Sequence, residues 1–130
     1  MTDKPDGAAL LEEARRTLVE VLLPLLPPER RYDGLMVANA MAIAAREAGQ
    51  GDAARREGLK MLSALFGESG ATAGPTTDLH AQLLDLEDRL ARKIRAGLCD
   101  APGPHRDAVR ACLRRSVVAR LRLSNPKALS

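Results

Sequence analysis

The sequence predicts a small all-α protein, a compact bundle of about five helices, and two observations support this fold class. Alanine and leucine, which favour helices, account for most of the 45% hydrophobic residues, whereas aromatic residues make up only 2% of the chain. Apolar residues also recur at spacings of three and four along most of the 130 residues, as in amphipathic helices. This length suits one ordinary domain, so we expect residues 1–130 to form a single helical domain.

The first helix is expected to begin after Asp6, because this residue follows Pro5 and can cap a helix N-terminus. Pro24 removes a backbone donor near the end of this helix, so its last turn should be kinked or already loop, and Pro27-Pro28 should stop it. The predicted apolar face of this helix consists of Leu10, Leu11, Ala14, Leu18, Val21, Leu22 and Leu25.

The second predicted helix, from about residue 29 to residue 48, is unusually apolar. Between residues 34 and 45 its only polar side chain is Asn39, and alanines dominate the rest. A helix that is apolar on nearly all sides belongs in the centre of a bundle. We therefore expect this alanine-rich helix to be the buried central element.

Two glycines, Gly49 and Gly51, are expected to separate the second helix from a third. Asp52 can cap this third helix, which should cover residues 53–66. Residues 67–76 are dominated by Gly, Ser, Thr and Pro and show no apolar periodicity. They are therefore predicted to form a flexible linker.

The fourth helix should open at Thr77 and Asp78 and carry an apolar seam with alternating spacings of four and three, which is typical of a helix–helix contact. The seam consists of Leu79, Leu83, Leu86, Leu90 and Ile94. Its short length favours packing inside the domain, and contact with a second copy of the chain is the alternative. A fifth helix is expected from about residue 105 to residue 123, ended by Asn125-Pro126.

The fifth helix should carry a basic stripe opposite its apolar face. The apolar face comprises Ala108, Val109, Cys112, Leu113, Ser116, Val117, Ala119 and Leu123, and the basic stripe comprises Arg106, Arg110, Arg114, Arg115 and Arg122. Such a stripe is either a solvated surface or a binding site for phosphate, nucleic acid or an acidic partner. A net charge of only +3 and the scarcity of aromatic side chains argue against nucleic acid.

Three polar residues are out of place on the predicted apolar faces. Asn39 and Arg46 share one stripe of the second helix, where a buried amide must be hydrogen-bonded. Arg120 falls within the apolar arc of the fifth helix, so we expect it to pair with a carboxylate or with helix-end carbonyls. Together they form a candidate site for a small anion such as a carboxylate or phosphate. The alternative is an internal network that fixes helix register.

The sequence contains no recognisable catalytic or cofactor-binding motif. Its glycines fall at predicted helix ends and not in a phosphate-binding loop or a dinucleotide fingerprint. Cys99, His105 and Cys112 are too widely spaced for a zinc finger, and His80 has no second ligand at metal-binding spacing. We therefore expect no metal and no cofactor, and favour a non-catalytic protein.

The chain is expected to reside in the cytoplasm. Residues 1–7 contain no apolar stretch resembling a secretion signal, and the two cysteines are compatible with a reducing compartment. The longest nearly apolar run, residues 34–45, is too short and too rich in alanine to span a bilayer.

Several stretches share a pattern with known sequences, namely Val37-Ala-Asn-Ala-Met-Ala-Ile-Ala-Ala-Arg-Glu47, Ile94-Arg-Ala-Gly97, Val118-Ala-Arg-Leu-Arg-Leu-Ser-Asn-Pro126, and Lys4-Pro5 with Leu10-Leu11 and Val21-Leu-Leu-Pro24. They resemble an uncharacterised bacterial family of short all-helical proteins, a domain of unknown function. The resemblance implies an all-α fold, no established activity, and genes that often lie near aminoglycoside-phosphotransferase-like kinases and acyl-CoA dehydrogenases. The family-like positions are Asn39, Arg46, Glu47, Arg95, Arg120, Asn125 and Pro126.

The leading hypothesis is a non-catalytic accessory protein that binds a protein partner, with a phosphotransferase-like kinase or an acyl-CoA dehydrogenase as candidates. The first alternative is a protein or enzyme that binds a small anion with Asn39, Arg46 and Arg120. The second alternative is a weak nucleic-acid binder that uses the basic stripe from Arg106 to Arg122.

Overall fold

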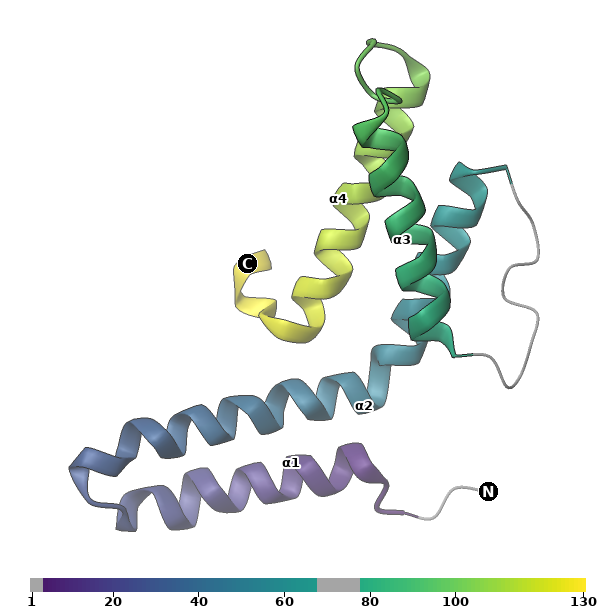
Figure 1. The fold of residues 1–130 in the computed structure, drawn as a ribbon. Helices are drawn as coiled ribbons and strands as arrows, with labels where there is room; N and C mark the ends of the chain where they lie inside the picture. The colour runs from purple at the N-terminus through teal and green to yellow at the C-terminus, as the bar shows by residue number, and fades with distance from the viewer. Residues whose placement is uncertain (1–3, 68–77) are drawn as a thin grey trace. The chain divides into compact units, whose positions relative to one another are not determined.

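The computed structural model describes residues 4–67 and 78–130, and within them it confirms the all-α class (Figure 1). The number of helices is close to the prediction. The α-helices are α1 (Gly7–Thr17), α2 (Arg31–Leu65), α3 (Leu79–Arg95) and α4 (Pro104–Ser124). Apart from Gly67, the predicted linker lies outside the described residues. The chain divides into two compact units: unit 1 holds residues 1–51 and 123–125, and unit 2 holds residues 52–122 and 126–130.

Helix α1 begins as predicted, because the Asp6 side chain accepts a hydrogen bond from the Ala9 backbone N–H at 2.9 Å. The expected distortion before the prolines is also present. A π-helical turn (Leu18–Leu22) is followed by a 3-10 turn (Leu23–Leu25) that contains Pro24. The chain then becomes extended at Leu26, and a second 3-10 turn (Pro28–Arg30) leads into α2.

Helix α2 is continuous from Arg31 to Leu65, so the predicted break between a second and a third helix is wrong. A glycine inside a helix costs only about 1 kcal/mol relative to alanine, which packing can offset. A Cβ atom built at Gly49 would lie 3.8 Å from the Cβ of Ala8, so α1 approaches the backbone of α2 closely at this point. Asp52, the expected cap, lies in the interior of α2 and forms an ion pair with Arg55.

In unit 1, α1 and the first part of α2 run antiparallel as a hairpin (Figure 1). The surface of α2 that faces α1 is made of small residues, including the buried Ala38 and Ala45. At Gly34 a Cβ atom would lie only 2.6 Å from Cδ1 of Leu23, so this position has almost no room for a side chain. The small residues therefore let the two helices pack closely.

The first half of α2 is buried along one stripe and not on all sides, which corrects the expectation of a fully buried central helix. Leu35, Met36 and Val37 each expose about half of their surface. The apolar face predicted for the first helix is covered only in part as well, because Leu10 of α1 is 56% exposed and Leu25, in the 3-10 turn that follows, is 77% exposed. The reason is that each helix of a two-helix hairpin has one packed side, whereas the apolar residues here occupy more than one side. No helix in the described ranges combines the length and apolarity needed to cross a membrane.

Unit 2 has a core of its own, formed where the second part of α2 packs with α3 and α4. The buried residues of this core are Leu59, Leu62, Leu86, Leu90, Val109 and Cys112. The predicted seam of α3 lies in this core, because Leu79, Leu83 and Ile94 pack against it beside the two buried leucines. The alternative, in which the seam contacts a second copy, is therefore disfavoured.

The ends of α3 and α4 follow the sequence signals. The Asp78 carboxylate caps α3, and Gly97, with φ of +103°, lies just beyond its C-terminus in a backbone conformation that other residues rarely adopt. Helix α4 ends before Asn125, and a 3-10 turn (Pro126–Leu129) follows.

Replacing Leu59 by alanine should lower the free energy of unfolding by about 2 to 5 kcal/mol, because this side chain is fully buried and its loss leaves a cavity. The measurement is chemical denaturation followed by circular dichroism. The matched control is Leu84→Ala, a leucine of the same unit that is 51% exposed, which should change stability by less than about 1 kcal/mol. Equal effects of the two substitutions would contradict the assignment of the core.

Candidate functional site

The structure gives Arg46 a hydrogen-bond partner within unit 1. Its Nε atom donates to the backbone carbonyl oxygen of Leu123 at 2.6 Å, and the side chain is partly buried. The last carbonyls of a helix have no partner inside the helix, and an arginine is a suitable donor for one of them. Arg46 thus holds the end of α4 to α2, which is a structural role.

Asn39 is exposed, so the expectation of a buried and hydrogen-bonded amide is wrong. The neighbouring Ala38 is buried, and successive residues of a helix are rotated by about 100°. Because only one stripe of this half of α2 is covered, that rotation carries Asn39 out of the contact.

Arg120 forms an ion pair with Glu87 of α3, which confirms that this residue, predicted within an apolar arc, has a carboxylate partner. The Glu87 side chain is 27% exposed and the Arg120 side chain 64% exposed. The pair therefore lies at the edge of the contact between α3 and α4, and it connects two helices that also share the core of unit 2.

The three residues of the predicted anion site are divided between the units. Asn39 and Arg46 belong to unit 1, and Arg120 belongs to unit 2. Two of them already bind groups of the protein itself. Neither unit alone holds the site, and anion binding by these residues stays a prediction.

The basic stripe of α4 is accessible along most of its length. Arg110, Arg114, Arg115 and Arg122 are exposed, and Arg106 is partly exposed. The apolar face of α4 is narrower than predicted, because Val109 and Cys112 are buried whereas Leu113 is 44% and Val117 56% exposed. At helical spacing, Leu113 and Val117 lie beside Arg110 and Arg114, and Arg115 and Arg122 lie on the far flank. We call Arg106, Arg110, Leu113, Arg114 and Val117 the outer face of α4.

Some polar residues in the structure were not singled out by the sequence. Arg89 and Lys93 of α3 lie over the ring of Phe66, with the guanidinium carbon 4.3 Å and the ammonium nitrogen 5.3 Å from its centroid. Ser63 is buried, and within the described residues its hydroxyl has no hydrogen-bond partner. The spacing of four between Arg89 and Lys93 was a visible signal, whereas nothing in the sequence marked Ser63.

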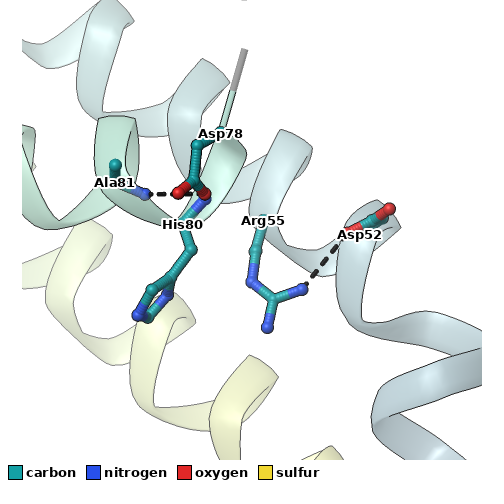
Figure 2. Close-up of polar contacts among 5 residues, drawn as sticks. All are labelled: Asp52, Arg55, Asp78, His80 and Ala81. Atoms are coloured by element: carbon teal, nitrogen blue, oxygen red, sulfur yellow. Dashed lines mark hydrogen bonds and ion pairs between the residues drawn. The ribbon is translucent and has the colours of Figure 1, made fainter. Parts of the chain in front are cut away.

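Figure 2 shows the start of α3 and the polar contacts near it. The Asp78 carboxylate accepts hydrogen bonds from the backbone N–H groups of His80 and Ala81, at 3.0 and 3.2 Å. On α2, Arg55 donates to Asp52 at 3.2 Å. These contacts cap and stabilise helices. Across residues 4–67 and 78–130, no three His, Cys, Asp or Glu side chains are grouped so that they could hold a metal ion.

The two cysteines differ in their surroundings. Cys112 is buried in the core of unit 2, and Cys99 is partly exposed. Burial raises the pKa of the Cys112 thiol, an effect that the nearby Arg115 opposes only in part. The thiol of Cys112 is therefore kept protonated, as expected for a small core residue and not for a nucleophile.

Residues 24–128 match the sequence model of a family described as Domain of unknown function (DUF6285). The chain belongs to the DUF6285 family. This confirms the resemblance to a domain of unknown function. No curated protein and no solved structure matches the chain.

The DUF6285 match covers the outer face of α4 and the residues of the predicted anion site, and it begins after α1. The Lys4-Pro5 and Leu10-Leu11 stretches therefore lie outside the matched range. The parts of the family pattern that the match supports are those on α2, α3 and α4.

A double-mutant cycle with Arg120→Ala and Glu87→Ala should give a coupling energy below about 1 kcal/mol that decreases as salt is added, because the arginine is largely exposed. The measurement is the unfolding free energy of the wild type, both single variants and the double variant. A coupling above about 2 kcal/mol that salt does not change would show that the pair is desolvated.

Cys112 should react with a thiol reagent several-fold more slowly than Cys99 at neutral pH, because it is buried and its raised pKa lowers the thiolate fraction. Its rate should increase as the pH is raised. The comparison uses Cys99→Ser, which leaves Cys112, and Cys112→Ala, which leaves Cys99. In denaturant the two thiols should react at similar rates, and similar rates in the folded protein would contradict the placement of α4.

Proposed function

We propose that this DUF6285 member is a non-catalytic accessory protein that binds an acidic and partly apolar surface of a partner protein through the outer face of α4. The observation that carries the proposal is the exposure of Leu113 and Val117 between accessible arginines. Protein interfaces typically combine an apolar centre with arginine, and a few such residues supply most of the binding energy.

Charge supports the choice of an acidic partner. Arg110 and Arg114 are one helical turn apart, so both guanidinium groups can bind carboxylates on the same surface. Helix α4 contains one acidic residue, Asp107, three positions before Arg110, so at most one of the two arginine charges is offset from within the helix. A surface of this kind attracts an acidic partner at long range and then buries Leu113 and Val117.

The same composition favours a protein over a nucleic acid. Nucleic-acid sites depend on many cationic contacts to phosphates and, for single strands, on aromatic side chains that stack with bases. The chain has one Tyr, one Phe and no Trp, and its net charge is only +3. Two exposed aliphatic side chains in the middle of the basic stripe would gain little from phosphate.

The resemblance described above supplies the candidate partners. A phosphotransferase-like kinase and an acyl-CoA dehydrogenase encoded near a gene of this family are the first proteins to test, in the cytoplasm of a bacterium. The role that fits a chain without a recognisable catalytic motif is to hold or regulate such an enzyme.

The test is a binding titration of the purified chain against each purified candidate enzyme, at low and at physiological salt. The double variant Arg110→Glu/Arg114→Glu should weaken binding at least about tenfold, which corresponds to about 1.4 kcal/mol. Leu113→Asn, which removes apolar surface without adding a charge, should weaken it similarly without changing the salt dependence. The matched control Arg115→Glu/Arg122→Glu makes the same charge change on the far flank of α4 and should leave affinity within about threefold.

Three results would overturn the proposal. The first is the absence of a complex with either enzyme at micromolar concentration, together with none recovered from native cell extract. The second is an equal loss of affinity in the control variant. The third is binding to random-sequence DNA or RNA that strengthens as salt is lowered, which would favour the nucleic-acid alternative.

A further inference from the structure

The Glu87–Arg120 ion pair lies on the side of α3 that is turned away from α2. On α3, Arg89 and Lys93 lie over the ring of Phe66, just beyond the end of α2, whereas Glu87 pairs with Arg120 of α4. Glu87 and Arg89 are two residues apart, so they point to nearly opposite sides of the helix. The second part of α2 therefore packs on one side of α3, and the ion pair marks the other side, where α3 contacts α4.

Half-exposed aliphatic side chains lie beside this ion pair. Leu84 is three residues before Glu87 and Val117 is three residues before Arg120, so each is rotated by the same angle of about 60° from its member of the pair. Because α3 and α4 are antiparallel and both right-handed, equal rotations point toward the same flank (Figure 1). Leu113, two turns before Arg120, points in nearly the same direction as Arg120. We call these five residues the α3–α4 face, and its three aliphatic side chains each expose about half of their surface.

The charges around the α3–α4 face are mostly positive. Within the face, Glu87 and Arg120 neutralise each other. The titratable groups around it are His80, Asp88, Arg92 and Arg95 of α3 and Arg106, Asp107, Arg110 and Arg114 of α4. Asp88 is paired with Arg92, so the four other arginines outnumber one carboxylate. Three of these arginines follow one another at spacings of four along α4, and an acidic partner therefore suits this edge of the face.

The backbone of α3 and α4 restricts what can cover this face. Inside both helices the N–H and C=O groups are paired with each other, so they offer no hydrogen bonds to an extended chain. A segment that covers the aliphatic side chains must then satisfy its own backbone groups, and a helix does so. The second part of α2 already packs against α3 and α4 in this way, in the core of unit 2.

We propose, on the basis of the proposed function above, that the partner covers the α3–α4 face with one amphipathic helix that is acidic along the edge facing α4. Its apolar side chains contact the aliphatic side chains of the face, and its carboxylates, one turn apart, bind Arg110 and Arg114. The helix covers both members of the Glu87–Arg120 pair, so neither ion is buried without its partner. Because Leu84 belongs to the face, the binding surface includes α3 as well as α4.

The experiment measures the affinity of variants of the purified full chain for the candidate enzyme that binds it, the phosphotransferase-like kinase or the acyl-CoA dehydrogenase. Leu84→Glu should weaken binding at least about tenfold, because it removes an aliphatic contact and places a carboxylate against an acidic helix. The matched control is Ala64→Glu, which adds the same charge at an exposed position of α2 and should leave affinity within about threefold. Circular dichroism of both variants shows whether their helices are retained.

Hydrogen exchange of the enzyme, measured with and without the wild-type chain, identifies the segment that is covered and does not depend on any variant. This segment should be a surface helix with acidic residues one turn apart. Protection confined to loops or strands of the enzyme overturns the partner helix, and so does an equal loss of affinity in Ala64→Glu.

The failure of the partner helix is distinct from the failure of the proposed function. A complex that is weakened by Arg110→Glu/Arg114→Glu but not by Leu84→Glu overturns the contact with α3 and leaves the proposed function intact. In the absence of any complex with either enzyme, the proposed function fails and the partner helix with it.

Discussion

The close packing around Leu59 is the interaction on which unit 2 depends. Among the described residues, Leu59 of α2 and Val109 of α4 are the largest side chains that are completely buried, and Leu86 and Leu90 of α3 belong to the same core. The buried side chains of this core are small or aliphatic, and the aromatic ring that packs against them, Phe66, is only partly buried, so the stability of the core comes mainly from the number and fit of aliphatic contacts. Because Val109 and Cys112 fix which side of α4 faces inward, they also fix which arginines face outward.

Unit 1 is packed differently, because α2 contacts α1 and the turns after it mainly through small residues. Gly34, Ala38 and Ala45 allow a close backbone approach, and the side chains of Leu23 and Leu26 fill the space above Gly34. Close approach improves van der Waals contact but removes little apolar surface from water. The two helices of the hairpin therefore fit closely but remove little apolar surface from water. Several leucine and valine side chains of unit 1 remain exposed as a result.

The sequence predicted the elements whose signals are local. Asp6 and Asp78 cap the helices they were expected to cap, Gly97 and the prolines end helices, and the heptad-like seam of α3 is in a core. The break at Gly49 was wrong because a glycine reports a backbone preference of about 1 kcal/mol, which tertiary contacts readily exceed. The exposure of Asn39, Leu113 and Leu25 could not be predicted from periodicity. An apolar pattern shows which residues share a face of a helix, but it does not show how many faces other elements cover. For the candidate site, the need of Arg120 for a carboxylate was predictable from its position, whereas its partner Glu87 was not.

The boundary between the two units falls inside α2, between Gly51 and Asp52, and this limits how the protein can be dissected. A cut at that point would create two new helix ends in place of a continuous ladder of hydrogen bonds, and each end would leave up to about four backbone groups without partners. Gly51 and Asp52 are residue types that can end and cap a helix, but they would replace only some of the hydrogen bonds that cross the cut. Fragments made by dividing the chain between Gly51 and Asp52 would therefore fray from the cut. Fragments that keep the whole of α2 are the better starting point for studying either unit.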